Sequence, residues 1–270
     1  MSDTKWESTI VGIASDLALK MGADIIKNYF LQQQELQNIE AMVNEICARV
    51  QKIVDLAFFR EYKAQLRALQ KNLDDYAANP HNTSTLDECH VMSQELFQKF
   101  TDFHTLEGIA AAMYAATLHL ITLRSESDHD PGGLVNLQRR ANEMADWVVG
   151  SSDEVISIYE KSIGPIQLDN FKAEYDSHRN RFARLEKWLG YYDFFRGDWV
   201  FIKAEKKLVE EEDRYLSEDD LKKKYEPTLI NECKDQHQVT FLARRAEGIK
   251  IQNVMLTTAE KWKGMNLIPV

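Results

Sequence analysis

The segment from Gly108 to Leu123, GIAAAMYAATLHLITL, most constrains the fold, because none of its sixteen side chains is charged at pH 7 unless His119 is protonated. A helix that is apolar on all sides has to be surrounded by other helices in a soluble protein. The segments before and after it have apolar residues on one helical face only. We therefore predict that about Gly108 to Arg124 forms the central helix of a bundle, followed by a polar loop from Ser125 to Gly133.

The length of this central segment limits a membrane role. At about 1.5 Å per residue it spans roughly 24 Å, whereas the hydrocarbon core is about 30 Å thick and needs about 20 apolar residues. We do not expect a permanent transmembrane helix, so any membrane insertion would be conditional.

Composition favours an all-α protein. The chain has 270 residues with only 11 Gly and 5 Pro, and its formal net charge is −10. That charge argues against nucleic acid as a partner, since phosphate binding needs a basic surface. The three cysteines are odd in number, which argues against a disulfide framework. Residues 1–22 lack the basic start and apolar run of a signal peptide, so we expect synthesis as a soluble cytoplasmic protein.

Apolar residues at three- and four-residue steps predict about six amphipathic helices around the central one. The residue before a proline disfavours helical geometry, so the third helix should end at Asn79-Pro80. The fourth helix should be capped by Ser84 or Thr85 and form an antiparallel hairpin with the central helix. The expected helices span residues 4–31, 36–50, 59–76, 86–103, 134–162 and 168–189.

The sequence after residue 189 changes character. Tyr191 to Phe201 is rich in aromatic residues, and the chain becomes highly charged from Lys203 onward. We expect a helix capped by Ser217, a break or kink at Pro227, and one or two further helices up to Lys263. This gives two parts: a helical bundle in residues 1–195 and a charged helical C-terminal extension in residues 196–270.

The segment YAATLHLITLRSES, Tyr114 to Ser127, resembles the central helix of the pore-forming domain of three-domain insecticidal crystal toxins (delta-endotoxins). The order of features in Arg67 to Glu88 is similar as well: a long helix, an Asn-Pro turn and the start of the next helix. The resemblance covers about Val43 to Gly164. It identifies the central-helix residues as Tyr114, Leu118, His119, Leu120 and Arg124.

This resemblance implies that the hairpin from Leu86 to Leu123 enters a target-cell membrane and oligomerises into a pore. The chain has nothing like the two β-rich receptor-binding domains of those toxins. A companion protein would then supply receptor recognition, and the protein would act outside the cell that makes it.

Glu88, Glu95 and Asp102 are seven residues apart and share one helical face, with Gln98 nearby. In a pore, an acidic stripe would favour cations. The alternative is an ordinary solvated helix face.

Three further features have a structural and a functional interpretation. His119 is either a satisfied core histidine or a pH trigger, because charging it in the bundle would be unfavourable. Arg124 either compensates the helix C-terminus or forms a salt bridge to another helix. Tyr191, Tyr192 and Trp199 either contact a membrane interface, where Trp and Tyr are enriched, or form core between the two parts.

The sequence offers little for catalysis. The histidine, cysteine and aspartate groups lack the paired spacing of a zinc site, and there is no phosphate-binding loop or nucleophile elbow. We expect neither enzyme activity nor a metal or cofactor. The prediction is a toxin-like pore-forming protein. The alternative is a non-enzymatic helical module that binds a protein partner and never enters lipid.

Overall fold

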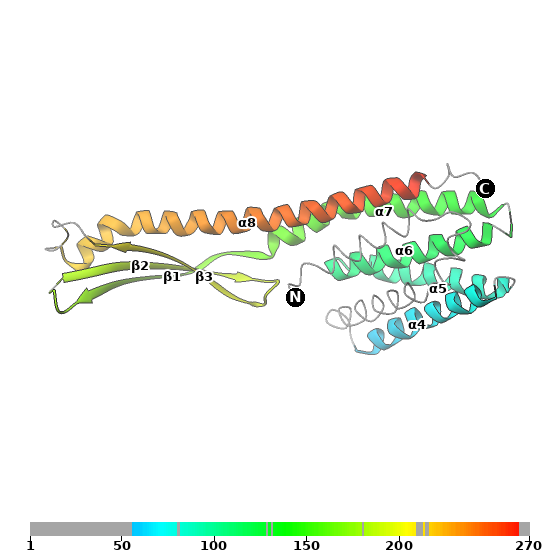
Figure 1. The fold of residues 1–270 in the computed structure, drawn as a ribbon, viewed down its shortest axis with the longest axis horizontal. Helices are drawn as coiled ribbons and strands as arrows, with labels where there is room; N and C mark the ends of the chain where they lie inside the picture. Colours follow the sequence, from blue (N-terminus) through cyan, green and yellow to red (C-terminus); the bar gives the residue numbers. More distant parts are fainter. Residues whose placement is uncertain are drawn as a thin grey trace. The chain divides into compact units, whose positions relative to one another are not determined.

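The computed structural model describes residues 56–79, 82–127, 129–130, 132–179, 181–208, 213 and 216–264. Figure 1 shows helices and a three-stranded antiparallel sheet in these residues. The predicted helices over residues 4–31 and 36–50 lie outside them. The elements are α4 (Leu56–Ala78), α5 (Thr83–Thr101), α6 (Leu106–Ser127), α7 (Gly133–Lys161), β1 (Ile163–Asp176), β2 (Arg181–Asp193), β3 (Asp198–Lys207) and α8 (Glu218–Gly264).

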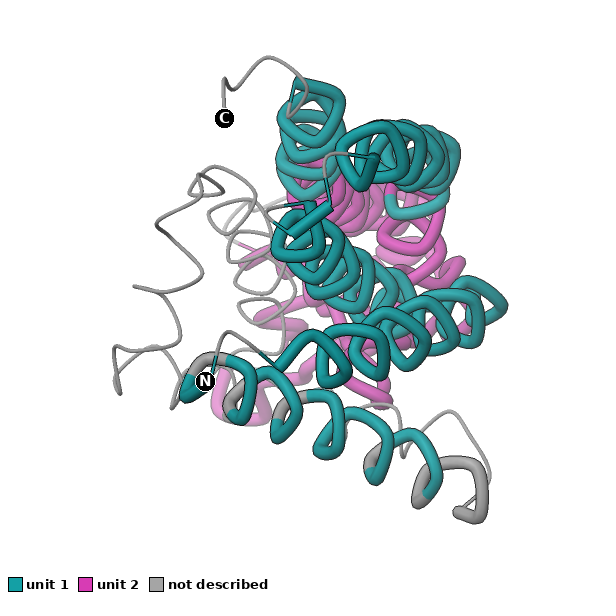
Figure 2. Tube along the Cα trace, turned by 90° about the vertical axis from the view of Figure 1, so that its right-hand side faces the viewer, with its two compact units in different colours: residues 1–155, 249–270 teal, residues 156–248 magenta. Residues whose placement is uncertain are grey.

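The chain divides into two compact units, coloured separately in Figure 2. Unit 1 comprises residues 1–155 and 249–270, and unit 2 comprises residues 156–248. Helices α7 and α8 each contribute to both units. The predicted boundary between two parts of the chain at residue 195 stays a prediction. The two units describe how the residues pack, not whether each part folds independently.

Unit 1 is helical and is built around α6. Every residue of α6 from Gly108 to Ser125 is buried. The ring of Phe100 on α5 contacts Tyr62 on α4, and Phe97 on α5 contacts Trp147 on α7. The prediction of a central apolar helix wrapped by amphipathic ones therefore holds for the described part of this unit.

Two predicted helix boundaries in unit 1 are wrong. Helix α5 begins at Thr83 after Asn82, whose side chain makes no capping hydrogen bond, so Ser84 and Thr85 are not the cap. Helix α6 continues to Ser127 instead of ending before a loop at Ser125. The hydroxyls of Ser125 and Ser127 donate to the carbonyls of Ile121 and Arg124, which satisfies these polar side chains within the helix. The end of α4 at Ala78, just before Asn79-Pro80, is confirmed.

Unit 2 contains the sheet, and it overturns the all-α prediction. The helix expected over residues 168–189 is a pair of antiparallel strands, and β3 lies in the extension that was expected to be helical. The error is one of periodicity. In β2 every second residue faces α8. One of these residues is Lys187, so the alternation of apolar and polar residues that is typical of a strand is interrupted.

Two aspartates close the turns of the sheet. Asp176 Oδ1 accepts hydrogen bonds from the backbone N–H groups of His178 and Arg179 between β1 and β2. Asp193 Oδ1 accepts from the N–H groups of Phe195 and Arg196 between β2 and β3. The second turn also needs Gly197, whose φ of +68° disfavours other residues. An aspartate that bonds to the backbone two or three residues later is a local sequence signal for a turn. The prediction of a helix over residues 168–189 overlooked this signal.

The first half of α8 runs along one face of the sheet (Figure 1). Leu221, Tyr225, Leu229 and Cys233 recur every fourth residue and pack on the strands. At the centre of this face Lys187 is buried and pairs with Asp169 and Glu226. Ser217 caps α8 as predicted, since its Oγ accepts from the N–H of Asp220. Of the predicted break or kink at Pro227, the break is wrong, because α8 continues through this residue.

Candidate functional site

Helices α5 and α6 form the antiparallel hairpin that the sequence predicts. The turn between them is fixed by Thr105, whose Oγ1 accepts a hydrogen bond from the N–H of Gly108 and whose carbonyl accepts one from Ile109. A Cβ atom at position 108 would lie 2.3 Å from the carbonyl oxygen of Phe103. Glycine at position 108 is therefore what allows the chain to turn this tightly.

The polar groups of α6 are largely satisfied inside the helix. The Oγ1 atoms of Thr117 and Thr122 donate to the carbonyls of Met113 and Leu118, four residues earlier. Hydroxyls bonded in this way need no partner on another helix and no water. These threonines would therefore keep their hydrogen bonds if α6 moved to another apolar environment.

His119 makes a buried polar contact between the two helices of the hairpin. Its Nδ1 lies 3.0 Å from Oγ of Ser93 on α5. The single hydroxyl hydrogen of Ser93 is directed 2.6 Å away to the carbonyl of Cys89, so Nδ1 of His119 is the donor to Oγ. The other ring nitrogen, Nε2, is buried and has no hydrogen-bond partner among the described residues.

Burial, together with the charges of the nearby His90 and Arg140, lowers the pKa of His119 to about 3. His119 is therefore neutral in the folded protein near neutral pH. The His90 ring contacts it edge-on at 4.9 Å between centroids. On its other side His90 Nδ1 lies 3.0 Å from the carboxylate of Glu126, near the end of α6.

Cys89 lies beside this group and is not a nucleophile. Burial, with the negative charges of Glu88 and Glu126, raises the pKa of its thiol to about 12. The thiolate is the reactive form of cysteine, so the side chain behaves as a small apolar group in the core.

The four predicted pore-lining residues are all exposed: Glu88, Glu95 and Gln98 on α5, and Asp102 as the residue that caps its C-terminus. They lie away from its buried residues, among which are Leu86, Leu96 and Phe100. Glu88 accepts a hydrogen bond from Asn72 of α4 at 3.0 Å. Helix α5 is thus amphipathic, with a polar surface that is acidic and solvated in this conformation.

The predicted central-helix residues are buried together. Tyr114, Leu118, His119 and Leu120 lie in the interior, and Arg124 is 6% exposed at the C-terminal part of the helix. Arg124 Nη1 donates to Oγ of Ser127 at 2.8 Å. A positive charge at this position interacts favourably with the negative end of the helix dipole.

The predicted interface aromatics fall on opposite faces of the sheet. Tyr191 is buried on the α8 side, where its ring contacts His237. Tyr192 and Trp199 pair across β2 and β3 on the other face, and their rings lie 5.8 Å apart. The structure therefore brings Tyr192 and Trp199 together and separates Tyr191 from them.

The described residues contain no group of three or more His, Cys, Asp or Glu side chains placed to hold a metal ion. His129 contacts the hydroxyl of Tyr76 at 3.2 Å.

Sequence reasoning missed Ser93 and the His90–Glu126 pair. Both depend on the register between α5 and α6, which spacing within one helix does not reveal. The only available signal was that Ser93 falls among Cys89, Leu96 and Phe100 on the buried face of α5.

Among the described residues, α6 is the one helix long and apolar enough to cross a membrane, judged by length and composition, and the buried core helix of a soluble protein meets the same criterion. No family model, characterised protein or solved structure matches this chain.

Proposed function

We propose that this protein is membrane-active: it is soluble as folded, releases the α5–α6 hairpin at a target membrane, and oligomerises into a pore. The observation that carries the proposal is α6 itself, which is buried all around and has no charged side chain from Gly108 to Leu123 while His119 is neutral. The 22 residues of α6 correspond to about 33 Å of helix, of which the sixteen uncharged residues cover roughly 24 Å of a hydrocarbon core of about 30 Å. Insertion would therefore be conditional, as the sequence predicts.

The energetics of the proposal are those of an exchange. In water, the surrounding helices cover α6, at about 25 cal/mol per Å² of apolar surface kept dry. Lipid can replace them without exposing that surface. The hydroxyls of Thr117 and Thr122 keep their partners because these lie in the same helix.

The hairpin would bring α5 into the membrane with α6. The exposed face of α5 with Glu88, Glu95, Gln98 and Asp102 would then line the pore, and its carboxylates would favour cations. Target-cell lipid and further copies of this chain are the partners, with a companion protein for receptor recognition.

The test is dye release from phosphatidylcholine vesicles at neutral and acidic pH, with the hairpin free or tethered. Asn72→Cys and Glu88→Cys place thiols on α4 and α5 at a contacting pair. A cleavable bifunctional reagent would join them, in a background in which Cys47 is replaced by Ser. Cys89 and Cys233 are buried and will not compete.

We expect release by the untethered protein, none when α4 and α5 are tethered, and recovery after cleavage of the reagent. The single-cysteine variants treated with the same reagent are the controls. Absence of release by the untethered protein at every pH contradicts the proposal.

The second candidate is a protein-binding module. It is favoured by Val239 and Leu242, which lie nearly one turn apart on α8 and are 67% and 49% exposed. A stable complex that is lost in Val239→Ser and Leu242→Ser, with no release from vesicles, would favour it over the pore.

A further inference from the structure

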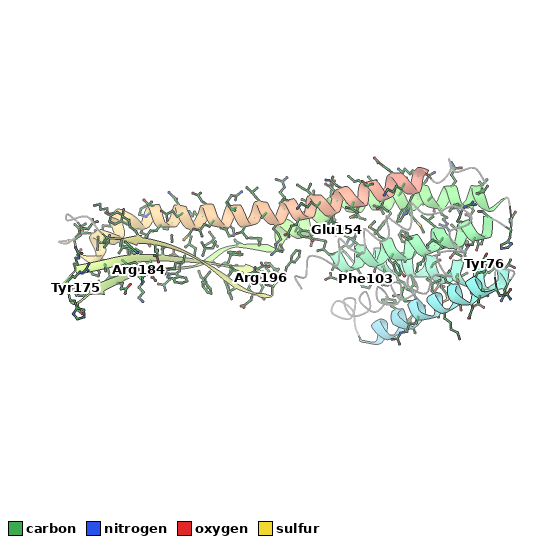
Figure 3. The ribbon with its side chains drawn as sticks, viewed as in Figure 1. Tyr76, Phe103, Glu154, Tyr175, Arg184 and Arg196 are labelled. Carbon is green, nitrogen blue, oxygen red and sulfur yellow. The ribbon has the colours of Figure 1, made fainter. Side chains whose placement is uncertain are left out.

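The sheet has a hollow on the face opposite α8, and the proposed pore does not use it. It is lined by Leu168, Asp169 and Asn170 of β1, Trp188 of β2 and Phe201 of β3. The site lies wholly within unit 2. Figure 3 marks the ends of the sheet around it, with Tyr175 and Arg184 towards one end and Arg196 towards the other.

The strand register creates the hollow. Leu168 and Phe201 lie opposite Gly190 from the two neighbouring strands. A Cβ atom at Gly190 would lie 3.0 Å from atoms of both side chains. A larger residue at position 190 would press against both side chains, and Trp188 lies two residues earlier on the same face.

The lining exposes large apolar side chains. Leu168 is 43% and Phe201 is 53% exposed. Contiguous exposed apolar groups bordered by polar residues are typical of binding surfaces. The indole of Trp188 is held in place, since its Nε1–H donates to Glu186 and the ammonium of Lys203 lies 5.2 Å from its ring centroid.

The charges around the hollow already have partners within the sheet and α8. Lys203 pairs with Glu186 at 2.7 Å and with Glu205 at 3.1 Å. Asp169 pairs with Lys187, which also binds Glu226. A charged ligand would have to compete with these pairs, so the hollow suits an uncharged one.

The hollow is open to solvent, so it can cover only one side of a ligand. A wholly apolar molecule would leave its other side in water. A pyranose ring has an apolar C–H face and a rim of hydroxyl groups, which fits an aromatic floor with an exposed amide beside it.

We propose that this hollow binds one hexose unit of a neutral glycan, with the C–H face of the sugar on Trp188 and Phe201 and its hydroxyls on the amide of Asn170. Binding here is independent of the pore, because none of these residues belongs to the α5–α6 hairpin.

The test is calorimetric titration of the full chain with three neutral trisaccharides, the β-linked trimers of glucose, galactose and N-acetylglucosamine. We expect at least one to bind, with affinity in the micromolar to millimolar range. Trp188→Ala should weaken binding about tenfold or more, which is about 1.4 kcal/mol. Asn170→Ala, an exposed position on an edge strand, should weaken it several-fold without disturbing the fold.

Trp199→Ala is the matched control, because Trp199 lies on the same face of the sheet but does not line the hollow. It should bind as the unmodified chain does. The proposal is overturned if none of the three sugars binds, or if binding survives both Trp188→Ala and Asn170→Ala. It is also overturned if phosphatidylcholine vesicles bind through Trp188 and the sugars do not.

Discussion

Oγ of Ser93 lies 3.0 Å from Nδ1 of His119, and this buried hydrogen bond joins α5 to α6. It holds His119 as the neutral tautomer with Nδ1 protonated. The remaining nitrogen, Nε2, is buried without a partner among the described residues. A second proton would therefore place a charge in the interior, where burial disfavours it more than the hydrogen bond to the backbone of His90 favours it, so the hairpin carries a group that responds to acid.

The first prediction concerns pH. The pKa of His119 is about 3 in the folded protein and about 6.5 when unfolded, so the unfolded state binds the proton more tightly. The free energy of unfolding should fall as pH drops below about 6.5, by about 1.4 kcal/mol per pH unit, until about pH 3. Denaturant titrations at several pH values would measure this slope.

The variant His119→Gln should remove that part of the slope, because it cannot be protonated in this range. His178→Gln is the control, since His178 is exposed in the β1–β2 turn. The groups around His119, namely His90, Glu126, Arg140 and Cys89, remain in both variants. Equal slopes in the two variants would show that His119 is not the acid-sensitive group.

The second prediction concerns the hairpin turn. Gly108→Ala adds a Cβ atom 2.3 Å from the carbonyl oxygen of Phe103, so the turn or the start of α6 must shift. We expect a loss of about 1–3 kcal/mol, typical of overpacking. Gly150→Ala on α7 meets nothing within 4 Å and should gain up to about 1 kcal/mol from helix propensity. Thermal unfolding of both variants tests this, and equal melting temperatures would contradict it.

The third prediction concerns the buried cation of unit 2. Lys187→Met removes the ammonium between Asp169 and Glu226 and leaves both carboxylates without their buried partner. We expect a loss of about 1–3 kcal/mol, the usual effect of leaving polar groups unpaired. Lys203→Met, which removes the more exposed ion pairs with Glu186 and Glu205, should cost less than about 1 kcal/mol. Chemical denaturation compares them, and a larger effect at Lys203 would refute this ranking.

The fourth prediction concerns ion selectivity and rests on the proposed pore. Replacing Glu88 and Glu95 by Gln and Asp102 by Asn removes the negative charges from the exposed face of α5. The reversal potential across a planar bilayer with a salt gradient should indicate cation preference for the unmodified chain and move towards zero for this variant. Glu143→Gln on α7, outside the hairpin, should leave it unchanged. An unchanged potential in the triple variant would place the lumen elsewhere.

The helices of unit 1 were predictable because their signals are local. An uncharged stretch of sixteen residues had to be buried, and Asn79-Pro80 had to end a helix. The extension of α6 to Ser127 was not predictable from polarity. Hydroxyls that bond to the preceding turn make serines compatible with a helix end that looks like a loop.

The sheet was not predicted because the alternation of apolar and polar residues along its strands is irregular. Phe171, Tyr175, Phe182, Leu185 and Leu189 happen to fit helical steps of three, four and seven residues. Lys187 is buried between Leu185 and Leu189, where the pattern required an apolar residue. Its burial depends on Asp169 and Glu226, 18 and 39 residues away along the chain. Pairing between neighbouring strands also placed Trp188 and Phe201 in one hollow.

The most direct test of the central claim is photolabelling from within the bilayer. Vesicles of phosphatidylcholine with a photoreactive group on the acyl chain would be mixed with the unmodified protein, irradiated, and the labelled peptides identified by mass spectrometry. The account predicts labels between Gly108 and Leu123 in membrane-bound protein, and none there when α4 and α5 are tethered. Labels confined to other segments, in protein that releases dye from the same vesicles, would contradict it.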